Sequence, residues 1–502
     1  MMTLASSVEP VLTSDDEELT MSSEFPRLAA VDCAAVGGGP SSKDCCWSGD
    51  DSFAHRMRLL PQSLAAALYR DTAPFVTTKG CRFSSGSASA MEKPTFQPRK
   101  VLIVTKITRY EFEKRVHNNV DDKHLESLLR RRGSDFNMLL MKHQIHHSYL
   151  DTIQSELERA GMESKVVNRF DYTEDAVNWA DAVMTAGGDG TFLLAASRVR
   201  QRNKPVIGIN TDPQGSEGYM CLMRKLPKEH FRSALQRLLD GDFNWLYRQR
   251  IRITVNGDSQ NGEVDSVQLH DVQLNRKPAT TRWMDSHITA SSSVFHTNSA
   301  TAASPDKEEL IARKLKKRQR NSPEMTSMEL PVLALNEVFI GESLSSRVSY
   351  YEIQIDDGAM VKQKSSGIAI CTGTGSTSWY FNINKLTEQC VAELLRITAE
   401  HCKVNLPVDD KQVVTDICTK FNQQLIFEPD SPRMAFTVRD PIFNATFSPT
   451  TPRGFAEKIR VKSRGYDAHL VVDGGVSYRF NDGTEAIVEV REEDALQTVV
   501  FR

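Results

Sequence analysis

The chain has 502 residues, enough for roughly two or three domains and a sizeable hydrophobic core. Its 62 lysines and arginines nearly balance 65 aspartates and glutamates, so the net charge of −3 favours neither nucleic acid nor an acidic membrane as a partner. No apolar run approaches the roughly 20 residues of a membrane-spanning helix. The nine cysteines form no C-x-x-C pair, so we expect free thiols in a reducing compartment.

Residues 1–98 do not have the pattern of a globular domain, and we expect them to form a disordered or targeting region. The part before residue 52 is acidic and rich in serine and glycine. Residues 57–90 carry four basic residues against one acid, with leucines that can share a helical face, as is typical of a mitochondrial transit peptide. Such peptides begin a chain, so we hypothesise that Met57 is the working start codon in some transcripts and that residues 1–56 are an alternative or mispredicted extension. A disordered cytosolic tail is the alternative.

Residues 99–245 alternate short apolar strands with helix-like stretches, which predicts an α/β domain around a parallel sheet. Ligands of such sheets bind at the carboxyl ends of the strands. A helix over 148–160, ended by Gly161, is among the predicted elements. His143 and His147 are spaced one helical turn apart, but no acid or cysteine lies at ligand spacing, so we predict no metal ligands here. The predicted strands cover residues 101–105, 165–167, 182–185 and 205–210.

The third strand leads into a glycine turn with a single carboxylate, Gly187-Gly188-Asp189-Gly190-Thr191. Glycines let a backbone approach a ligand closely, and the amides at the start of the following helix favour an anion such as phosphate. A carboxylate repels phosphate, so Asp189 is better suited to accept a proton or to contact magnesium. The alternative is a tight turn in which Asp189 only caps the helix.

Residues 246–502 are mostly strand-like, which predicts a second, all-β domain. Period-two alternation runs over residues 248–255, and further strands are expected at 334–340, 348–355 and 361–371. Residues 277–328 are predicted to be a disordered insertion and 385–422 a helical one. The last strand, residues 495–501, is predicted to return to the first domain.

Two polar stretches interrupt this β domain. Asn336-Glu337 lies inside an apolar strand, where each side chain needs a partner if buried, and a ligand can be that partner. Thr374-Gly375-Ser376-Thr377-Ser378 follows a strand and offers many N–H and O–H donors to phosphates, although it lacks the lysine of a Walker A loop. The alternatives are a strand-end pair satisfied by backbone and an ordinary polar turn.

Together the three stretches resemble the GGDG, NE/D and TGST motifs of the NAD kinase family, and in particular its animal mitochondrial branch. The resemblance implies a Rossmann-like α/β domain followed by a β-sandwich. It also implies that the γ-phosphoryl of ATP is transferred to the 2′-hydroxyl of NAD's adenosine ribose, giving NADP in the mitochondrial matrix. Asp189 would be the base and Mg²⁺ would bridge the donor phosphates. The residues that would bind NAD and ATP are Gly187, Gly188, Gly190, Thr191, Tyr219, Asn336, Glu337, Thr374, Gly375, Ser376, Thr377 and Ser378.

A homodimer is also implied by the resemblance, whereas the choice between ATP and polyphosphate as donor, and any use of NADH, are not. Two departures from the family pattern stand out. Gly373 replaces a proline, and Ser378-Trp379 replaces Ala-Tyr. The competing interpretations are another GGDG-type kinase, acting on a lipid or a sugar phosphate, and a catalytically inactive NAD-binding homologue.

Overall fold

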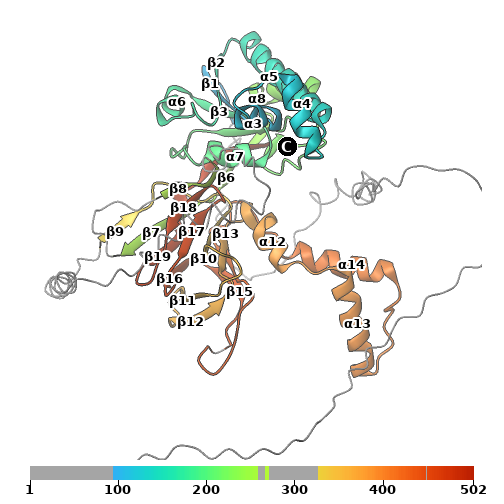
Figure 1. Cartoon of the computed structure of the whole chain (residues 1–502), viewed down its shortest axis with the longest axis vertical. Coiled ribbons are helices and arrows are strands. Elements are labelled where there is room, and N and C mark those ends of the chain that lie inside the picture. Colours follow the sequence, from blue (N-terminus) through green and yellow to red (C-terminus); the bar gives the residue numbers. More distant parts are fainter. Residues whose placement is uncertain (1–93, 258–265, 271–325, 448, 502) are drawn as a thin grey trace, which may run out of the picture. The chain divides into compact units, whose positions relative to one another are not determined.

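The computed structural model describes residues 94–257, 266–270, 326–447 and 449–501 (Figure 1). They belong to one compact unit that spans residues 90–502. The predicted transit-like segment, 57–90, lies outside the described residues. Phe96 is 3% exposed and belongs to the core of the first sheet, so the folded chain begins before the predicted boundary at residue 99.

The first domain is built on a five-stranded parallel sheet with the order β2-β1-β3-β4-β5. The central strands β1, β3 and β4 are almost fully buried because helices cover both faces of the sheet, whereas the edge strand β2 is partly exposed. The chain moves to one side of β1 to form β2 and to the other side to form β3, which creates a topological switch point between β1 and β3. The strands are β1 (Lys100–Thr105), β2 (Glu163–Val167), β3 (Ala182–Ala186), β4 (Val206–Ile209) and β5 (Cys221–Met223).

Helices α5 and α8 pack on one face of this sheet, and α6 and α7 on the other. Gly161 follows α5 with a positive φ of 77°, as predicted, but α5 begins at Phe136 rather than at residue 148. The helices of this domain are α3 (Arg109–Val116), α4 (Asp122–Arg131), α5 (Phe136–Arg159), α6 (Glu174–Trp179), α7 (Asp189–Ala196) and α8 (Phe231–Leu239).

The C-terminal strand β20 (Leu496–Phe501) pairs antiparallel with β6 (Phe243–Arg248). Phe243 and Val499, from these two strands, are buried in the same core as one face of the parallel sheet. The end of the chain therefore completes the first domain's core.

The strand predicted over residues 248–255 is in fact two strands, because β6 ends at Arg248 and β7 (Ile251–Gly257) begins three residues later. Arg250 lies between them and is fully buried. Its guanidinium donates hydrogen bonds to the carbonyls of Ala196, Val199 and Asp494. This buried cation joins the end of α7 to the start of the β domain.

The second domain consists of two antiparallel sheets, with the orders β15-β14-β13-β10-β17-β18-β8 and β12-β11-β16-β19-β7-β9. Apolar side chains from both sheets form one core, as in a β-sandwich. The remaining strands are β8 (Ser266–Gln268), β9 (Thr326–Glu329), β10 (Glu337–Glu342), β11 (Ser349–Ile355), β12 (Val361–Ser365), β13 (Ile368–Cys371), β14 (Met434–Val438), β15 (Arg453–Ala456), β16 (Lys458–Ser463), β17 (Ala468–Val472), β18 (Val476–Arg479) and β19 (Glu485–Val490).

Two segments of this domain differ in part from the sequence prediction. The single strand expected over 361–371 is divided at Gly367, whose φ of +119° lets the chain cross from one sheet to the other. The insertion predicted to end at residue 328 ends earlier, because β9 pairs with β7. The rest of the insertion, up to residue 325, lies outside the described residues.

Residues 385–422 are helical as predicted, with α13 (Glu388–Cys402) and α14 (Lys411–Gln423) following the short α12 (Trp379–Asn384). Within the part of the chain that the structure describes, no helix is both long enough and apolar enough to cross a membrane.

Candidate active site

The glycine turn lies at the carboxyl end of β3, beside the switch point of the parallel sheet. The amide of Lys106, just after β1, donates to the carbonyl of Ala186 at 3.0 Å, so the ends of β1 and β3 lie together. A Cβ on Gly187 would lie 2.2 Å from Thr191 Oγ1, so packing alone requires glycine there. A Cβ on Gly190 would meet no atom within 4 Å, which leaves open space beside the start of α7.

Asp189 does not cap α7. The N-cap residue is Gly188, which makes no side-chain cap, and Asp189 is the first helical residue. Its carboxylate instead accepts the backbone amides of Tyr219 at 3.0 Å and Met220 at 2.8 Å. The capping interpretation is therefore wrong. The segment that leads into β5 holds the Asp189 carboxylate at the carboxyl end of β3.

The segment before β5 is anchored by Asn210, which is fully buried. Its amide donates to the carbonyls of Ser216 and Arg224 at 3.2 and 2.6 Å. Gly218 has a φ of +61°, and a Cβ there would lie 2.7 Å from Asn210 Nδ2. The Tyr219 side chain is 51% exposed, and the Arg224 guanidinium lies 4.6 Å from its ring centre. The fixed backbone thus presents an aromatic ring and a cation next to Asp189.

The Asn336-Glu337 pair lies at the start of β10. Its backbone is hydrogen-bonded to the buried carboxylate of Asp473. Asp473, directly after β17, accepts the amides of Leu335, Asn336 and Glu337 at 2.8, 2.8 and 3.0 Å. It adopts a left-handed φ of 47°, which Asp tolerates better than most residues. Gly474 and Gly475 follow Asp473 in the chain, so the acid stands at the start of a glycine turn. The structure identifies it as the clamp of the Asn-Glu pair.

Two buried oxygens of this pair, Asn336 Oδ1 and Glu337 Oε2, have no hydrogen-bond partner among the described residues. Burial, and then the charge of Asp473, raise the pKa of the Glu337 carboxyl to about 7. Burial also raises the pKa of Asp473 to about 6, against the opposing effect of its amide donors. Buried polar atoms are nearly always satisfied, so these two oxygens are suited to receive hydrogen bonds from a bound molecule.

The second glycine turn packs directly on the Asn-Glu pair. A Cβ on Gly375 would lie 2.1 Å from the Asn336 carbonyl oxygen, and the Thr372 amide donates to that oxygen at 3.0 Å. Ser378 Oγ donates to Glu337 Oε1 at 3.5 Å. A Cβ on Gly373 would lie 1.8 Å from the Glu428 carbonyl oxygen, so this chain has room for no larger residue there.

Several hydroxyls of the Thr374–Thr377 turn are used within the protein. Ser376 Oγ donates to the carbonyl of Gly373 and accepts the amide of Phe427. Thr377 Oγ1 donates to the carbonyl of Thr374. These contacts give Ser376 a structural role, whereas Trp379 is 60% exposed at the start of α12.

Arg248 contacts the second glycine turn, although no motif in the sequence marks it as a site residue. Its guanidinium donates to Thr374 Oγ1 at 3.1 Å. Burial raises the pKa of the Cys221 thiol to about 12. Asp189 also raises it, while Arg248 and Arg224 lower it. The carboxylate and both guanidinium groups therefore lie near one buried point, Cys221. The only sequence signal was two arginines flanking Gln249 in an otherwise strand-like pattern.

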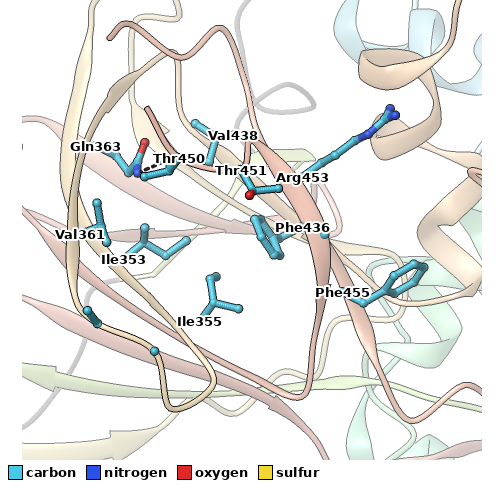
Figure 2. A pocket seen from close by; sticks show the side chains of 13 residues that line it. Ile353, Ile355, Val361, Gln363, Phe436, Val438, Thr450, Thr451, Arg453 and Phe455 are labelled. Atoms are coloured by element: carbon cyan, nitrogen blue, oxygen red, sulfur yellow. Dashed lines mark hydrogen bonds between the residues drawn. The ribbon is translucent and has the colours of Figure 1, made fainter. Parts of the chain in front are cut away.

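A cavity of about 380 Å³ lies elsewhere, lined by residues of β11 and β12 from one sheet and of β14 and β15 from the other (Figure 2). Its wall is largely apolar, with Ile353, Val361 and Phe436 among the residues that line it. Gln363 and Thr450 are hydrogen-bonded to each other at its edge (Figure 2). None of the predicted site residues lines this cavity, so it is separate from the candidate active site.

The chain is similar to known proteins over most of its length. Residues 101–243 match the family described as the ATP-NAD kinase N-terminal domain. The protein "NAD kinase 2, mitochondrial" of Xenopus tropicalis is 41% identical over 438 residues, which cover 84% of this chain and 93% of the relative. The human protein of that name is 42% identical over 408 residues, covering 81% and 85%. The mouse protein is 40% identical over 493 residues, covering 93% and 97%.

Two solved structures are also similar. A yeast NADH kinase complexed with NADH has a TM-score of 0.42 and 15% identity, and the match covers 81% of this chain and 84% of the yeast chain. An NAD kinase from Archaeoglobus fulgidus in complex with ATP has a TM-score of 0.41 and 16% identity, covering 80% and 93%.

Proposed function

This chain belongs to the NAD kinase family and makes NADP from NAD and ATP in mitochondria, and on that premise we propose which of its residues carry the reaction. Asn336 and Glu337 bind NAD, Asp189 receives the proton of the 2′-hydroxyl, and the first glycine turn, at the start of α7, holds the donor phosphates. The assignment depends most on one observation. The buried oxygens Asn336 Oδ1 and Glu337 Oε2 have no partner among the described residues.

Those two oxygens support NAD as the acceptor because both are in a position to accept hydrogen bonds. A nucleotide supplies ribose hydroxyls and amide N–H groups as donors, and each bond to a buried carboxylate is worth about 1.5–3 kcal/mol. The Asp473 clamp holds the backbone on which both side chains stand. The site is therefore preorganised, so binding of NAD loses little free energy to the ordering of this backbone.

Asp189 is suited to the role of base by its position. Two backbone amides, of Tyr219 and Met220, fix the carboxylate beside the open space at Gly190. A positioned base contributes typically about 10²–10⁴-fold to a rate. Phosphoryl transfer otherwise needs alignment and charge neutralisation more than covalent help.

The donor phosphates are assigned to the start of α7 and to nearby arginines. The first amides of α7 lack partners within the helix, and an anion can accept their N–H groups. Arg248, which donates to Thr374, and Arg224, beside Tyr219, supply positive charge near Cys221, which also senses the charge of Asp189. Among the described residues, no set of three metal-ligating side chains includes Asp189. Mg²⁺ would therefore be held mainly by the phosphates, whose charge it neutralises.

The experiment that tests the proposal is a set of parallel assays on the purified full chain with ATP and magnesium. We expect NADP formation from NAD and no phosphorylation of sphingosine, diacylglycerol or fructose 6-phosphate. Phosphorylation of a lipid or sugar phosphate alone would show a different acceptor, and no turnover with intact NAD binding would show an inactive homologue. Replacing ATP by polyphosphate, and NAD by NADH, in the same assay determines the donor and acceptor range.

Two further proposals rest on the resemblance. The chain is a homodimer, which light scattering on the purified protein tests, since a monomeric mass would refute it. Residues 57–90 act as the transit segment. N-terminal sequencing of the protein from mitochondria tests this, and a mature form that retains residues 1–56 would contradict it.

A further inference from the structure

Three metal-ligating side chains meet where α3 packs against α5. His143 and His147 are four residues apart on α5, which places them on one face of the helix. Glu111 comes from the first turn of α3. One ligand atom from each residue lies within 4.8 Å of the other two. The acidic partner absent from the sequence around the histidines is thus supplied by a different helix.

The separation of two of these atoms matches a metal site. His147 Nε2 lies 3.2 Å from Glu111 Oε1. With metal–ligand bonds of about 2.0–2.1 Å, two ligands of a tetrahedral zinc ion are about 3.3 Å apart. The same distance also fits a simple hydrogen bond, so the contact alone does not distinguish the two possibilities. His143, the third residue, brings one more ligand atom to within 4.8 Å of these two, which completes a set of three.

Thr108 orients both Glu111 and His143. Its hydroxyl donates to Glu111 Oε2 at 3.0 Å, and its backbone amide donates to the same oxygen at 2.7 Å. With that hydroxyl proton directed to Glu111, His143 Nδ1, 2.9 Å from Thr108 Oγ1, is the donor of its own bond. The lone pair of His143 is then on Nε2. Glu111 Oε1 and His147 Nε2 contact each other, and His143 Nε2 keeps its lone pair for a ligand. Thr108 is the kind of outer partner that ligating side chains have in zinc sites.

Packing also restricts the rings. The centres of the His143 and His147 rings are 4.3 Å apart, and the Tyr110 ring lies 4.7 Å from that of His143. The neighbouring His146 takes no part. It is fully buried, and its two nitrogens contact Thr105 Oγ1 and Thr211 Oγ1 at 2.8 and 2.9 Å.

We propose that Glu111, His143 and His147 form a binding site for one zinc ion, with a fourth coordination position open to solvent. The open position follows from exposure, since the side chains of His147 and Glu111 are 41% and 37% exposed. Two imidazoles and one carboxylate favour zinc over magnesium, which prefers oxygen ligands alone. The ion would join α3 to α5 and fix the segment that begins at Lys106, whose amide contacts the strand end before the glycine turn.

The test is a zinc titration of the chelator-treated full chain, in competition with a chromophoric chelator and without nucleotide. The variants are Glu111→Gln, His143→Ala and His147→Ala. The matched control is His124→Ala, which removes an exposed histidine of α4 whose ring is hydrogen-bonded to Asp121. The cysteines are the same in all five proteins, so any zinc they bind cancels in the comparison.

We expect the wild type and His124→Ala to bind one zinc equivalent more tightly, by at least about 100-fold, than each ligand variant. This exceeds the 10–100-fold effect typical of outer partners. Co²⁺ in the wild type should show the visible absorption of a tetrahedral site. Zinc should raise the melting temperature of the wild type and not of His147→Ala.

Equal zinc affinity in the wild type and the three ligand variants, or an octahedral Co²⁺ spectrum, would overturn the proposal. NADP formation in zinc-free buffer with magnesium serves as the folding control. We expect the ligand variants to retain wild-type turnover there, because the proposed catalytic residues are elsewhere. The inference therefore stands or falls independently of the proposed roles of Asp189 and Glu337.

Discussion

Replacing Glu337 by glutamine should stabilise the protein without substrate and weaken its binding of NAD. The substitution keeps the shape of the side chain and removes its charge. In the structure this charge is buried beside Asp473, and one of its oxygens has no partner among the described residues. The ionised carboxylate is therefore a cost to the folded state, which a bound ligand can offset.

The size of that cost follows from the pKa. A carboxyl whose pKa rises from 4.5 to about 7 destabilises the ionised folded state by about 3 kcal/mol, at about 1.36 kcal/mol per pH unit. The folded protein holds this proton more tightly than the unfolded chain does. The free energy of unfolding of the wild type therefore falls as the pH rises from 4.5 to about 7, and this contribution is constant above that range.

Chemical unfolding of the two proteins at pH 4.5 and pH 8 measures the effect. We expect similar stability at the lower pH and an advantage of about 3 kcal/mol for Glu337→Gln at the higher pH. The contribution of Asp473 remains in both proteins. Glu342→Gln, at the other end of β10, is the matched control and should show no such pH-dependent gain. At pH 8 the KM for NAD should rise by about 10- to 150-fold in Glu337→Gln, as for a lost bond of 1.5–3 kcal/mol.

Two results would refute this reasoning. One is an equal pH dependence of stability in the wild type and Glu337→Gln, which would show that the carboxylate is not desolvated in the fold. The other is an unchanged KM for NAD in Glu337→Gln, which would show that Glu337 Oε2 does not contact the substrate.

Three further predictions concern residues of the same site and its support. Gly190→Ala should lower kcat and leave the melting temperature unchanged. Gly375→Ala, whose methyl would lie 2.1 Å from the Asn336 carbonyl oxygen, should lower both kcat and the melting temperature. Equal melting temperatures of the two variants would contradict this. Arg248→Met should raise the KM for ATP by about 10- to 150-fold, with partial recovery in Arg248→Lys, and an unchanged KM would remove Arg248 from phosphate binding. Arg250→Met leaves three buried carbonyls without their donor, so we expect a loss of about 2–5 kcal/mol in urea unfolding; a loss below 1 kcal/mol would contradict it.

The parts of the fold that could be predicted from the sequence are those whose structure is determined by one local pattern of residues. The apolar run of β1 and the glycine turn after β3 belong to this class. Other elements depend on distant partners. The strand predicted over 248–255 is divided where Arg250 finds its carbonyl acceptors, which lie at and just after the end of α7 and before β20. β5 has only three residues and no periodicity to detect.

The candidate site shows the same division. Its three motifs could be identified from residue type and order, but their contacts could not. Asp473 lies more than a hundred residues after the pair that it clamps. Glu111 and His147 meet only because α3 folds back on α5. Such pairings are set by tertiary packing, and spacing along the chain does not encode them.

The most direct test of the central claim is the rate of NADP formation by Asp189→Asn, measured together with its affinity for NAD. Asparagine keeps the shape of the side chain but cannot receive the hydroxyl proton. We predict that kcat falls by about 10²–10⁴-fold or more while the Kd for NAD and the overall fold are retained. A variant with the kcat of the wild type would contradict the assignment of Asp189 as the base.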